Sequence, residues 1–200
     1  MIPHEHVFFG PYLAKFNIDQ EFSNRMLKQG KKLKISHATN LAGKIKTELL
    51  YDTKNDPWVL EGYYPFINSW IEGYEKTSGE KLSIQGVSAQ SIWINFQKKN
   101  EMNPMHTHTN CDLSFVHWIK IPKAIINEGK KDITKSNRPG GISFFYGEEQ
   151  DLVRTIRDFI PADDVLMVFP SKLRHEVMPF KSNVTRISVA GNIKFHYGSS

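Results

Sequence analysis

Two histidines separated by a single residue occur in the segment Met105-His106-Thr107-His108. In an extended strand, side chains at positions i and i+2 lie on the same face, about 6.6 Å apart along the chain. Neutral imidazole is the commonest metal ligand among side chains, so two rings placed in this way can approach one metal ion. Because such a pair alone is weak evidence, a metal site at His106 and His108 needs a further ligand from elsewhere.

A third imidazole follows the apolar segment Val165–Phe169, where a short loop leads to His175. The apolar segment predicts a strand, and His175 is then placed near the start of the next strand. A barrel brings the ends of distant strands to a common mouth, so His175 is a candidate third ligand. The similar segment His4-Glu5-His6 has no such companion and lies near the terminus, where we expect it to be structural or exposed to solvent.

A polar strand face is predicted in the segment Thr185–Ala190, where alternation places Arg186 and Ser188 on one side and apolar residues on the other. The planar guanidinium of arginine suits a carboxylate, and a serine hydroxyl adds a hydrogen bond. This pattern favours a lined pocket that holds an acidic ligand.

The residues that could do chemistry lie in a part of the chain that we expect to be rich in β-strands. Many short strands without helices between them are typical of a sandwich or a barrel. The segment Ile125–Arg138, which contains a glycine and several basic residues, is predicted to be a long exposed loop. The predicted strands are Ser91–Phe96, Leu113–Ile121, Gly141–Tyr146, Val165–Phe169 and Thr185–Phe195.

Helices are predicted in the first part of the chain. One begins after Asp19, a suitable N-cap, and ends near Gly30. A second begins near Pro65 and ends at Gly79, and its apolar residues at helical spacing predict that it covers a sheet. We therefore expect a single domain over residues 1–200, with a mixed α/β part at 1–85 and a β core at 86–197.

A resemblance to a known family is carried by three segments: NPMHTHTNCDLSFVHWIKIP, VLMVFPSKLRHEVMPF and TRISVAGNIKF. In this order they resemble the iron(II)/2-oxoglutarate-dependent oxygenases, in particular small members from bacteria and marine phages. The resemblance covers Gly86–Phe195, a little over half of the chain. It implies a mainly β fold, a double-stranded β-helix of the jelly-roll or cupin-like kind, with the N-terminal helices packed on its sheet.

The resemblance implies an Fe(II) site in which His106 and His175 match the two family histidines. The family has Asp or Glu where this chain has His108, which leaves two readings. Either His108 is the middle ligand, or Asp112 supplies a carboxylate after a turn. The spacing favours His108, because positions i and i+2 of a strand need no special backbone.

The resemblance also implies that Arg186 holds the far carboxylate of 2-oxoglutarate, with Ser188 as its neighbour and Asn95 as a further contact. The implied function is a dioxygenase that hydroxylates an unidentified substrate and releases succinate and CO2, with no side chain assigned as a catalytic acid or base. Two alternatives remain open: a non-catalytic metal-containing barrel that acts as a binding module, and a cupin-like three-histidine metalloenzyme without 2-oxoglutarate.

Composition excludes several other classes of protein. The 13 Phe, 7 Tyr and 4 Trp exclude a disordered chain. The net charge of +5 comes without a zinc-finger, RNA-recognition or P-loop motif, so nucleic acid is not favoured as a partner. No apolar run approaches about 18 residues, which excludes a membrane span. Because Cys111 is the single cysteine, we expect a reducing, cytoplasmic compartment. The substrate, whether a small molecule or a peptide, and the oligomeric state stay open.

Overall fold

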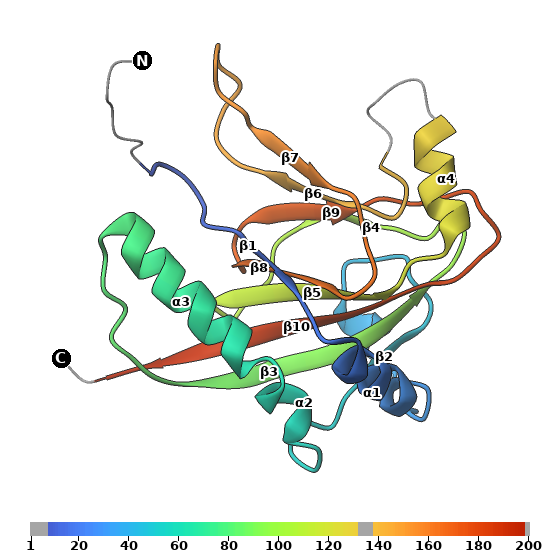
Figure 1. The fold of residues 1–200 in the computed structure, drawn as a ribbon, viewed down its shortest axis with the longest axis horizontal. Helices are drawn as coiled ribbons and strands as arrows, with labels where there is room; N and C mark the ends of the chain where they lie inside the picture. Colours follow the sequence, from blue (N-terminus) through green and yellow to red (C-terminus); the bar gives the residue numbers. More distant parts are fainter. Residues whose placement is uncertain (1–7, 132–137, 199–200) are drawn as a thin grey trace.

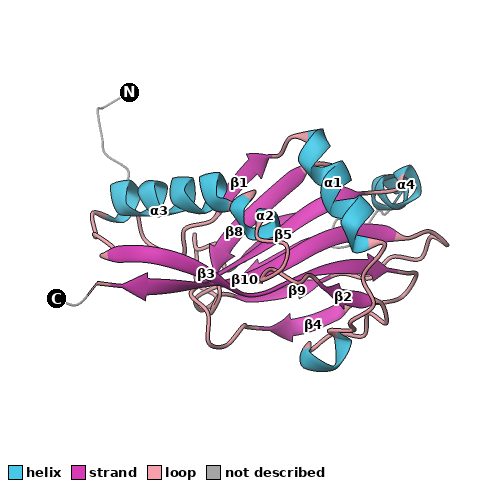
Figure 2. Cartoon of the chain, turned by 90° about the horizontal axis from the view of Figure 1, so that it is seen from below, coloured by secondary structure: helices cyan, strands magenta, loops and turns pink. Residues whose placement is uncertain are grey.

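The fold consists of two antiparallel β-sheets with helices on the outer face of the larger one (Figures 1 and 2). A computed structural model describes residues 8–131 and 138–198. In spatial order, the larger sheet contains β1 (Ala14–Asn17), β8 (Val165–Pro170), β5 (Leu113–Lys120), β10 (Arg186–Tyr197), β3 (Ile84–Gln97) and β2 (Glu48–Leu50). The smaller sheet contains β4 (Asn103–His106), β9 (Arg174–Val177), β6 (Ile142–Phe145) and β7 (Ile156–Phe159). The predicted strands and the mainly β class are confirmed.

Three helices, α1 (Gln20–Gly30), α2 (Trp58–Glu61) and α3 (Tyr64–Ser78), cover the face of the larger sheet that is turned away from the smaller one (Figure 2). The helix α4 (Lys123–Lys131) lies elsewhere, and its Ile126 packs against the core between the two sheets. A 3-10 turn, η1, spans Ala38–Asn40. As predicted, the carboxylate of Asp19 caps α1 by accepting a hydrogen bond from the backbone N–H of Glu21. Gly79 ends α3 at a φ of 76°, a left-handed conformation that glycine adopts without strain.

Two apolar cores lie on the two faces of the larger sheet, because successive strand residues point to opposite sides. The core under the helices contains Ile67 and Trp70 of α3 together with Ile94 of β3. The core between the two sheets contains Trp118 of β5 and Phe144 of β6. The two sheets thereby form a sandwich whose interior is apolar at one end, which leaves the other end for polar groups.

His117 and Trp118 are neighbours in β5 and face opposite cores. His117 is fully buried on the helix side, where its ring nitrogens hydrogen-bond to Ser23 Oγ and Tyr63 Oη, each at 3.0 Å. Because both ring nitrogens are used in these hydrogen bonds, His117 has a structural role on the face of the sheet opposite to the three histidines described below.

The prediction of a long exposed loop over Ile125–Arg138 is wrong in its first part. Residues up to Lys131 belong to α4, and Ile125 is completely buried. The sequence does not predict this short amphipathic helix, because Ile125 and Ile126 give only one turn of apolar spacing and the glycine and lysines are typical of a loop. Residues 132–137 lie outside the described part of the chain, as does the segment His4-Glu5-His6. No helix in the described part is long and apolar enough to cross a membrane.

Candidate metal centre

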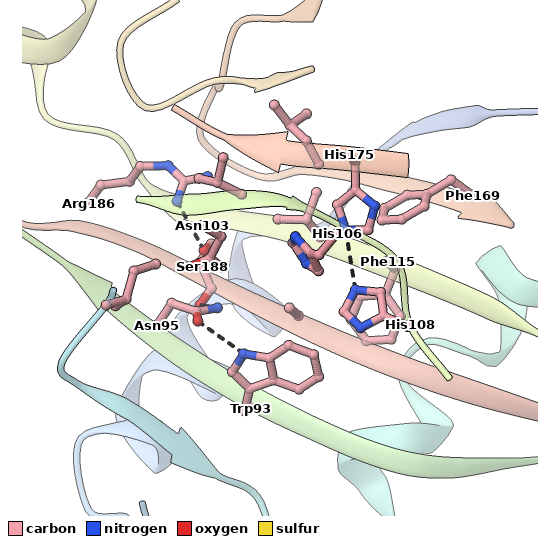
Figure 3. A pocket seen from close by; sticks show the side chains of 15 residues that line it. Trp93, Asn95, Asn103, His106, His108, Phe115, Phe169, His175, Arg186 and Ser188 are labelled. Carbon is pink, nitrogen blue, oxygen red and sulfur yellow. Dashed lines mark hydrogen bonds between the residues drawn. The ribbon is translucent and has the colours of Figure 1, made fainter. Parts of the chain in front are cut away.

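Three histidines come together at one end of the sandwich (Figure 3). His106 ends β4 and His175 lies in β9, and the two residues are register partners in the smaller sheet. His108 follows β4 directly, and its backbone N–H donates to the carbonyl of Ser171 at 2.9 Å. One ligand atom from each of the three residues lies within 4.8 Å of the other two. The pairing of β4 with β9 therefore brings distant parts of the sequence to one point.

Hydrogen bonds orient two of the three rings. The Nδ1 atom of His106 donates to the carbonyl of Pro104 at 2.7 Å, and Nδ1 of His175 donates to the carbonyl of Leu173 at 2.8 Å. Because the proton of each neutral ring is then on Nδ1, the lone pair of Nε2 is available to a metal. Metal-binding histidines are commonly held in this way.

The distance between the Nε2 atoms of His108 and His175 is 3.2 Å. Two neutral lone pairs that face each other so closely repel unless a proton or a cation lies between them. Two nitrogen ligands with metal bonds of about 2.1 Å at right angles lie about 3 Å apart. The donor set therefore fits a divalent transition metal.

Burial keeps the three imidazoles neutral. Burial, with smaller contributions from the neighbouring imidazoles His175 and His106, lowers the pKa of His108 to about 3. Burial and the nearby His106 similarly lower the pKa of His175 to about 4. The pKa of His106 is lowered by burial as well. Since a metal binds only the unprotonated imidazole, the pocket holds these side chains in the ligating form.

Asp112, the alternative middle ligand, is turned away from the histidines. Its carboxylate accepts a hydrogen bond from the backbone N–H of Phe195 at 2.8 Å and forms an ion pair with Lys194 at 3.0 Å. The turn that would bring Asp112 to His106 is not formed. Of the two readings that the sequence leaves open, the geometry supports His108 as the middle ligand.

Arg186 lies in the same cavity as the histidines and is almost completely buried, with 1% of its surface exposed. Its Nη1 atom donates to Gln97 Oε1 at 2.8 Å and lies 3.4 Å from Ser188 Oγ. Its Nε and Nη2 atoms have no hydrogen-bond partner among the described residues. Burial lowers the pKa of Arg186 to about 9, so the guanidinium is still charged at neutral pH. A buried cation with two unused donors is suited to a carboxylate.

Asn95 also lines this cavity, but other protein groups use its amide. Its Nδ2 atom donates to the carbonyl of Ser188 at 3.3 Å, and its Oδ1 atom accepts from Trp93 Nε1 at 3.0 Å (Figure 3). Asn95 thus ties β3 to β10 beside Arg186. The predicted pocket residues Arg186, Ser188 and Asn95 all line one cavity with the three histidines.

Sequence reasoning missed Asn192, which lies behind His108. The side-chain nitrogen of Asn192 is 3.4 Å from Nδ1 of His108, and its oxygen accepts from Ser114 Oγ at 2.9 Å. If the two amide atoms of Asn192 are exchanged, its nitrogen donates a hydrogen bond to Ser114 Oγ and its oxygen accepts one from His108 Nδ1. Alternation from Arg186 through Ser188 could have indicated Asn192, because all three share one strand face.

Replacing Asn192 by leucine is expected to weaken metal binding about tenfold, since loss of an outer hydrogen bond to a ligand costs 10–100-fold. Competition between the protein and a coloured chelator measures the metal affinity. Asn40→Leu is the matched control, because Asn40 is an exposed amide that contacts His37 and none of the three histidines. Equal metal affinities of Asn192→Leu and Asn40→Leu would show that Asn192 does not support His108.

A buried acid, Glu48, lies opposite Asn95 in the pairing of β2 with β3. It is completely buried, and neither carboxyl oxygen has a hydrogen-bond partner among the described residues. Burial, with a contribution from nearby Glu101, raises the pKa of Glu48 to about 8. The folded protein therefore holds Glu48 protonated at neutral pH, whereas the unfolded chain ionises it near the ordinary pKa of 4.5.

Glu48 should make stability decrease with rising pH. A raised folded pKa contributes stability that is fully present below about pH 4.5 and is lost as pH rises to about 8. Glu48→Gln removes this loss. The free energy of unfolding of the variant, relative to that of the parent, should therefore increase by about 3 kcal/mol from about pH 5 to about pH 8. Urea denaturation at both pH values measures it, with the exposed Glu61→Gln as control. A difference in unfolding free energy between Glu48→Gln and the parent that stays constant with pH contradicts the prediction.

Comparison with known proteins gives the class of protein. The family model described as "Putative 2OG-Fe(II) oxygenase" matches residues 91–192, just over half of the chain, and this range includes all three histidines and Arg186. No curated protein sequence gives a significant match. The protein is a 2-oxoglutarate-dependent oxidoreductase. More specifically, the chain belongs to the 2OG-Fe(II) oxygenase family that this model describes.

Solved structures show the same fold at low sequence identity. A 2OG-Fe(II) oxygenase family oxidoreductase from Burkholderia pseudomallei has a TM-score of 0.60 and 13% identity, covering 94% of this chain and 86% of its own. A Pseudomonas putida prolyl-4-hydroxylase has a TM-score of 0.54 and 12% identity, with coverage of 94% and 93%. The viral collagen prolyl hydroxylase of Paramecium bursaria Chlorella virus-1 has a TM-score of 0.58 and 11% identity, with coverage of 92% and 96%.

Proposed function

We propose that this protein is an Fe(II)- and 2-oxoglutarate-dependent dioxygenase that hydroxylates its substrate and releases succinate and CO2. The observation that carries the proposal is the presence, in one cavity, of three converging imidazoles and a buried arginine with two unused donors. The first group suits a divalent metal and the second suits a carboxylate. Their separate positions match a ligand that carries an acid at each end.

In this proposal, the Nε2 atoms of His106, His108 and His175 hold the iron. When bound, iron together with 2-oxoglutarate and O2 supplies the oxidant that inserts one oxygen atom into a substrate C–H bond, while the co-substrate loses CO2 and becomes succinate. Three neutral ligands leave open positions on the metal for the co-substrate and O2. We also propose that the two sheets form the double-stranded β-helix of this family.

Arg186 orients the co-substrate by pairing with its far carboxylate through Nε and Nη2, while Gln97 and Ser188 keep the guanidinium in place. The apolar side chains Ile142 and Phe169 line the same cavity and exclude water from it. A dry cavity strengthens the ion pair and protects a reactive centre from side reactions.

The proposal is tested with purified protein that is loaded with Fe(II) under argon. We expect isothermal titration to show 2-oxoglutarate binding without O2. Once O2 is admitted, we expect 2-oxoglutarate labelled at its C1 carboxyl to release CO2 slowly even without substrate. The proposal fails if neither binding nor CO2 release is found. Metal binding without either signal would instead favour a binding module or a cupin-like metalloenzyme.

A further inference from the structure

One edge of the larger sheet is open next to the metal centre. The strand β3 has 14 residues and pairs with β10 along most of its length, but β2 pairs only with Trp93–Asn95 on its other side. The remaining outer edge of β3, Gln85–Gln90, has no strand partner among the described residues. We call this segment the open edge. Figure 1 shows it at the end of β3 that runs toward α3.

Main-chain groups on the open edge point away from β10. Val87 and Ala89 lie opposite Phe195 and Ile193 of β10. The N–H of Phe195 and the carbonyl of Ile193 bond instead on the β5 side, to Asp112. In an antiparallel pair, two residues that lie opposite each other either bond to each other or both point their N–H and C=O groups away. The N–H and C=O groups of Val87 and Ala89 therefore point outward, away from β10. They offer the pattern of donors and acceptors that another strand would pair with.

The open edge carries neither of two common protections against pairing, charge and proline. Natural proteins place charged residues or proline on exposed edges, which otherwise pair with other chains. The segment Gln85–Gln90 contains neither. At the edge of the smaller sheet, by contrast, β7 carries Arg157 and Asp158. Register shifts against β10 lie at both ends of the open edge, one beside Gln85 and one beside Gln90, where the edge reaches the metal centre.

The open edge leads into a cleft of about 330 Å³ whose wall includes His106 and His108. Apart from histidines, the cleft has no ionisable side chain, so it does not select a charged group. Amide and hydroxyl groups dominate the lining and suit the amide groups of a main chain. The polar residues of the cleft are Asn40, Gln90, Ser91, Thr107, Thr109 and Asn192.

We propose that the substrate is an extended polypeptide that adds as a strand to the open edge of β3 and places an uncharged side chain in the cleft beside His106 and His108. Binding along a sheet edge draws affinity from main-chain hydrogen bonds, and pockets for alternate side chains give specificity. This inference rests on the proposed function, since it names the substrate class of the same site. Its evidence, the open edge and the neutral cleft, is independent of the metal ligands.

The first test uses a phage-displayed library of random dodecapeptides, selected on protein loaded with Mn(II) and 2-oxoglutarate. We expect enriched peptides to slow hydrogen exchange at the amides of Val87 and Ala89, and to gain one oxygen atom when Fe(II) and O2 replace Mn(II). Slowed exchange reports docking without any activity. Peptides that slow exchange but gain no oxygen atom would count against the proposed function rather than against the docking site.

The second test removes one outward donor from the open edge. Val87→Pro deletes an N–H that does not bond to β10, and we expect it to weaken peptide binding about tenfold, as for loss of a hydrogen bond. Val87→Ala, which loses the side chain and keeps the N–H, should bind as the parent does. Both variants should keep the parent's binding of 2-oxoglutarate, which also shows that they fold.

A third measurement does not depend on any variant folding. An enriched peptide that is N-methylated at alternate residues, on the side that pairs, should no longer bind the parent protein, while methylation on the other side should be tolerated. The proposal is overturned if no peptide is enriched, if bound peptides leave Val87 and Ala89 unprotected, or if both methylated peptides bind equally. Protection of the same amides by a single-stranded oligonucleotide but by no peptide would also overturn it.

Discussion

Replacing Arg186 by leucine is expected to abolish measurable 2-oxoglutarate binding. The guanidinium is the buried cation of the cavity, and its Nε and Nη2 atoms have no other partner among the described residues. Losing one member of a buried, hydrogen-bonded charge pair costs about 3 kcal/mol, which corresponds to a weakening of about a hundredfold or more. Isothermal titration and CO2 release without substrate both measure this loss.

Metal binding separates a local effect of Arg186→Leu from general damage. The variant should bind Co(II) as the parent does, because the hydrogen bonds of the arginine go to Gln97 and Ser188 and not to the three histidines. The control Arg174→Leu removes an exposed guanidinium from β9 and should leave 2-oxoglutarate binding intact. If Arg186→Leu still bound 2-oxoglutarate normally, the arginine would have another role and the cupin-like alternative would gain support.

Replacing His175 by alanine is expected to weaken metal binding by more than a hundredfold, because even partners outside the ligand set contribute about 10–100-fold. The variant loses one of three converging Nε2 atoms and leaves the hydrogen-bonded ring of His106 in place. Titration with Co(II), followed by the visible absorption of the bound ion, measures the affinity. The exposed His196→Ala, which removes an imidazole that contacts Ser88, is the control.

Two further variants decide the middle ligand. His108→Asp introduces the carboxylate that the resemblance implies at this position, and we expect it to bind metal within about tenfold of the parent. Asp112→Asn should leave metal affinity unchanged, because the Asp112 carboxylate is occupied by Lys194 and Phe195. Loss of metal in Asp112→Asn, together with retention in His108→Ala, would show that Asp112 rearranges to bind the ion.

Much of the fold could be predicted because strand alternation is a local property. The face that Arg186 shares with Ser188, and the opposite apolar face, follow from the period of two alone. The helix caps at Asp19 and Gly79 were equally local signals. The general geometry of a barrel made His175 a candidate ligand, and the resemblance to a family paired it with His106, since no local pattern predicts that β4 and β9 become neighbours.

The parts that sequence reasoning missed depend on tertiary contacts. The helix α4 is held by the burial of Ile125, whereas its own sequence contains Gly129 and two terminal lysines. The contact of Asn192 with His108 depends on where the loop after β4 lies, which alternation within β10 does not specify. The open edge of β3 likewise depends on the short length of β2, which was not among the predicted strands.

The buried guanidinium of Arg186 also has a consequence for the lifetime of the protein. Without an anionic partner, the folded chain carries a desolvated charge that the unfolded chain exposes to water. Any diacid that binds the folded form alone raises the melting temperature in proportion to the logarithm of its concentration. Resistance of the folded chain to proteolysis should therefore rise with the concentration of such a diacid.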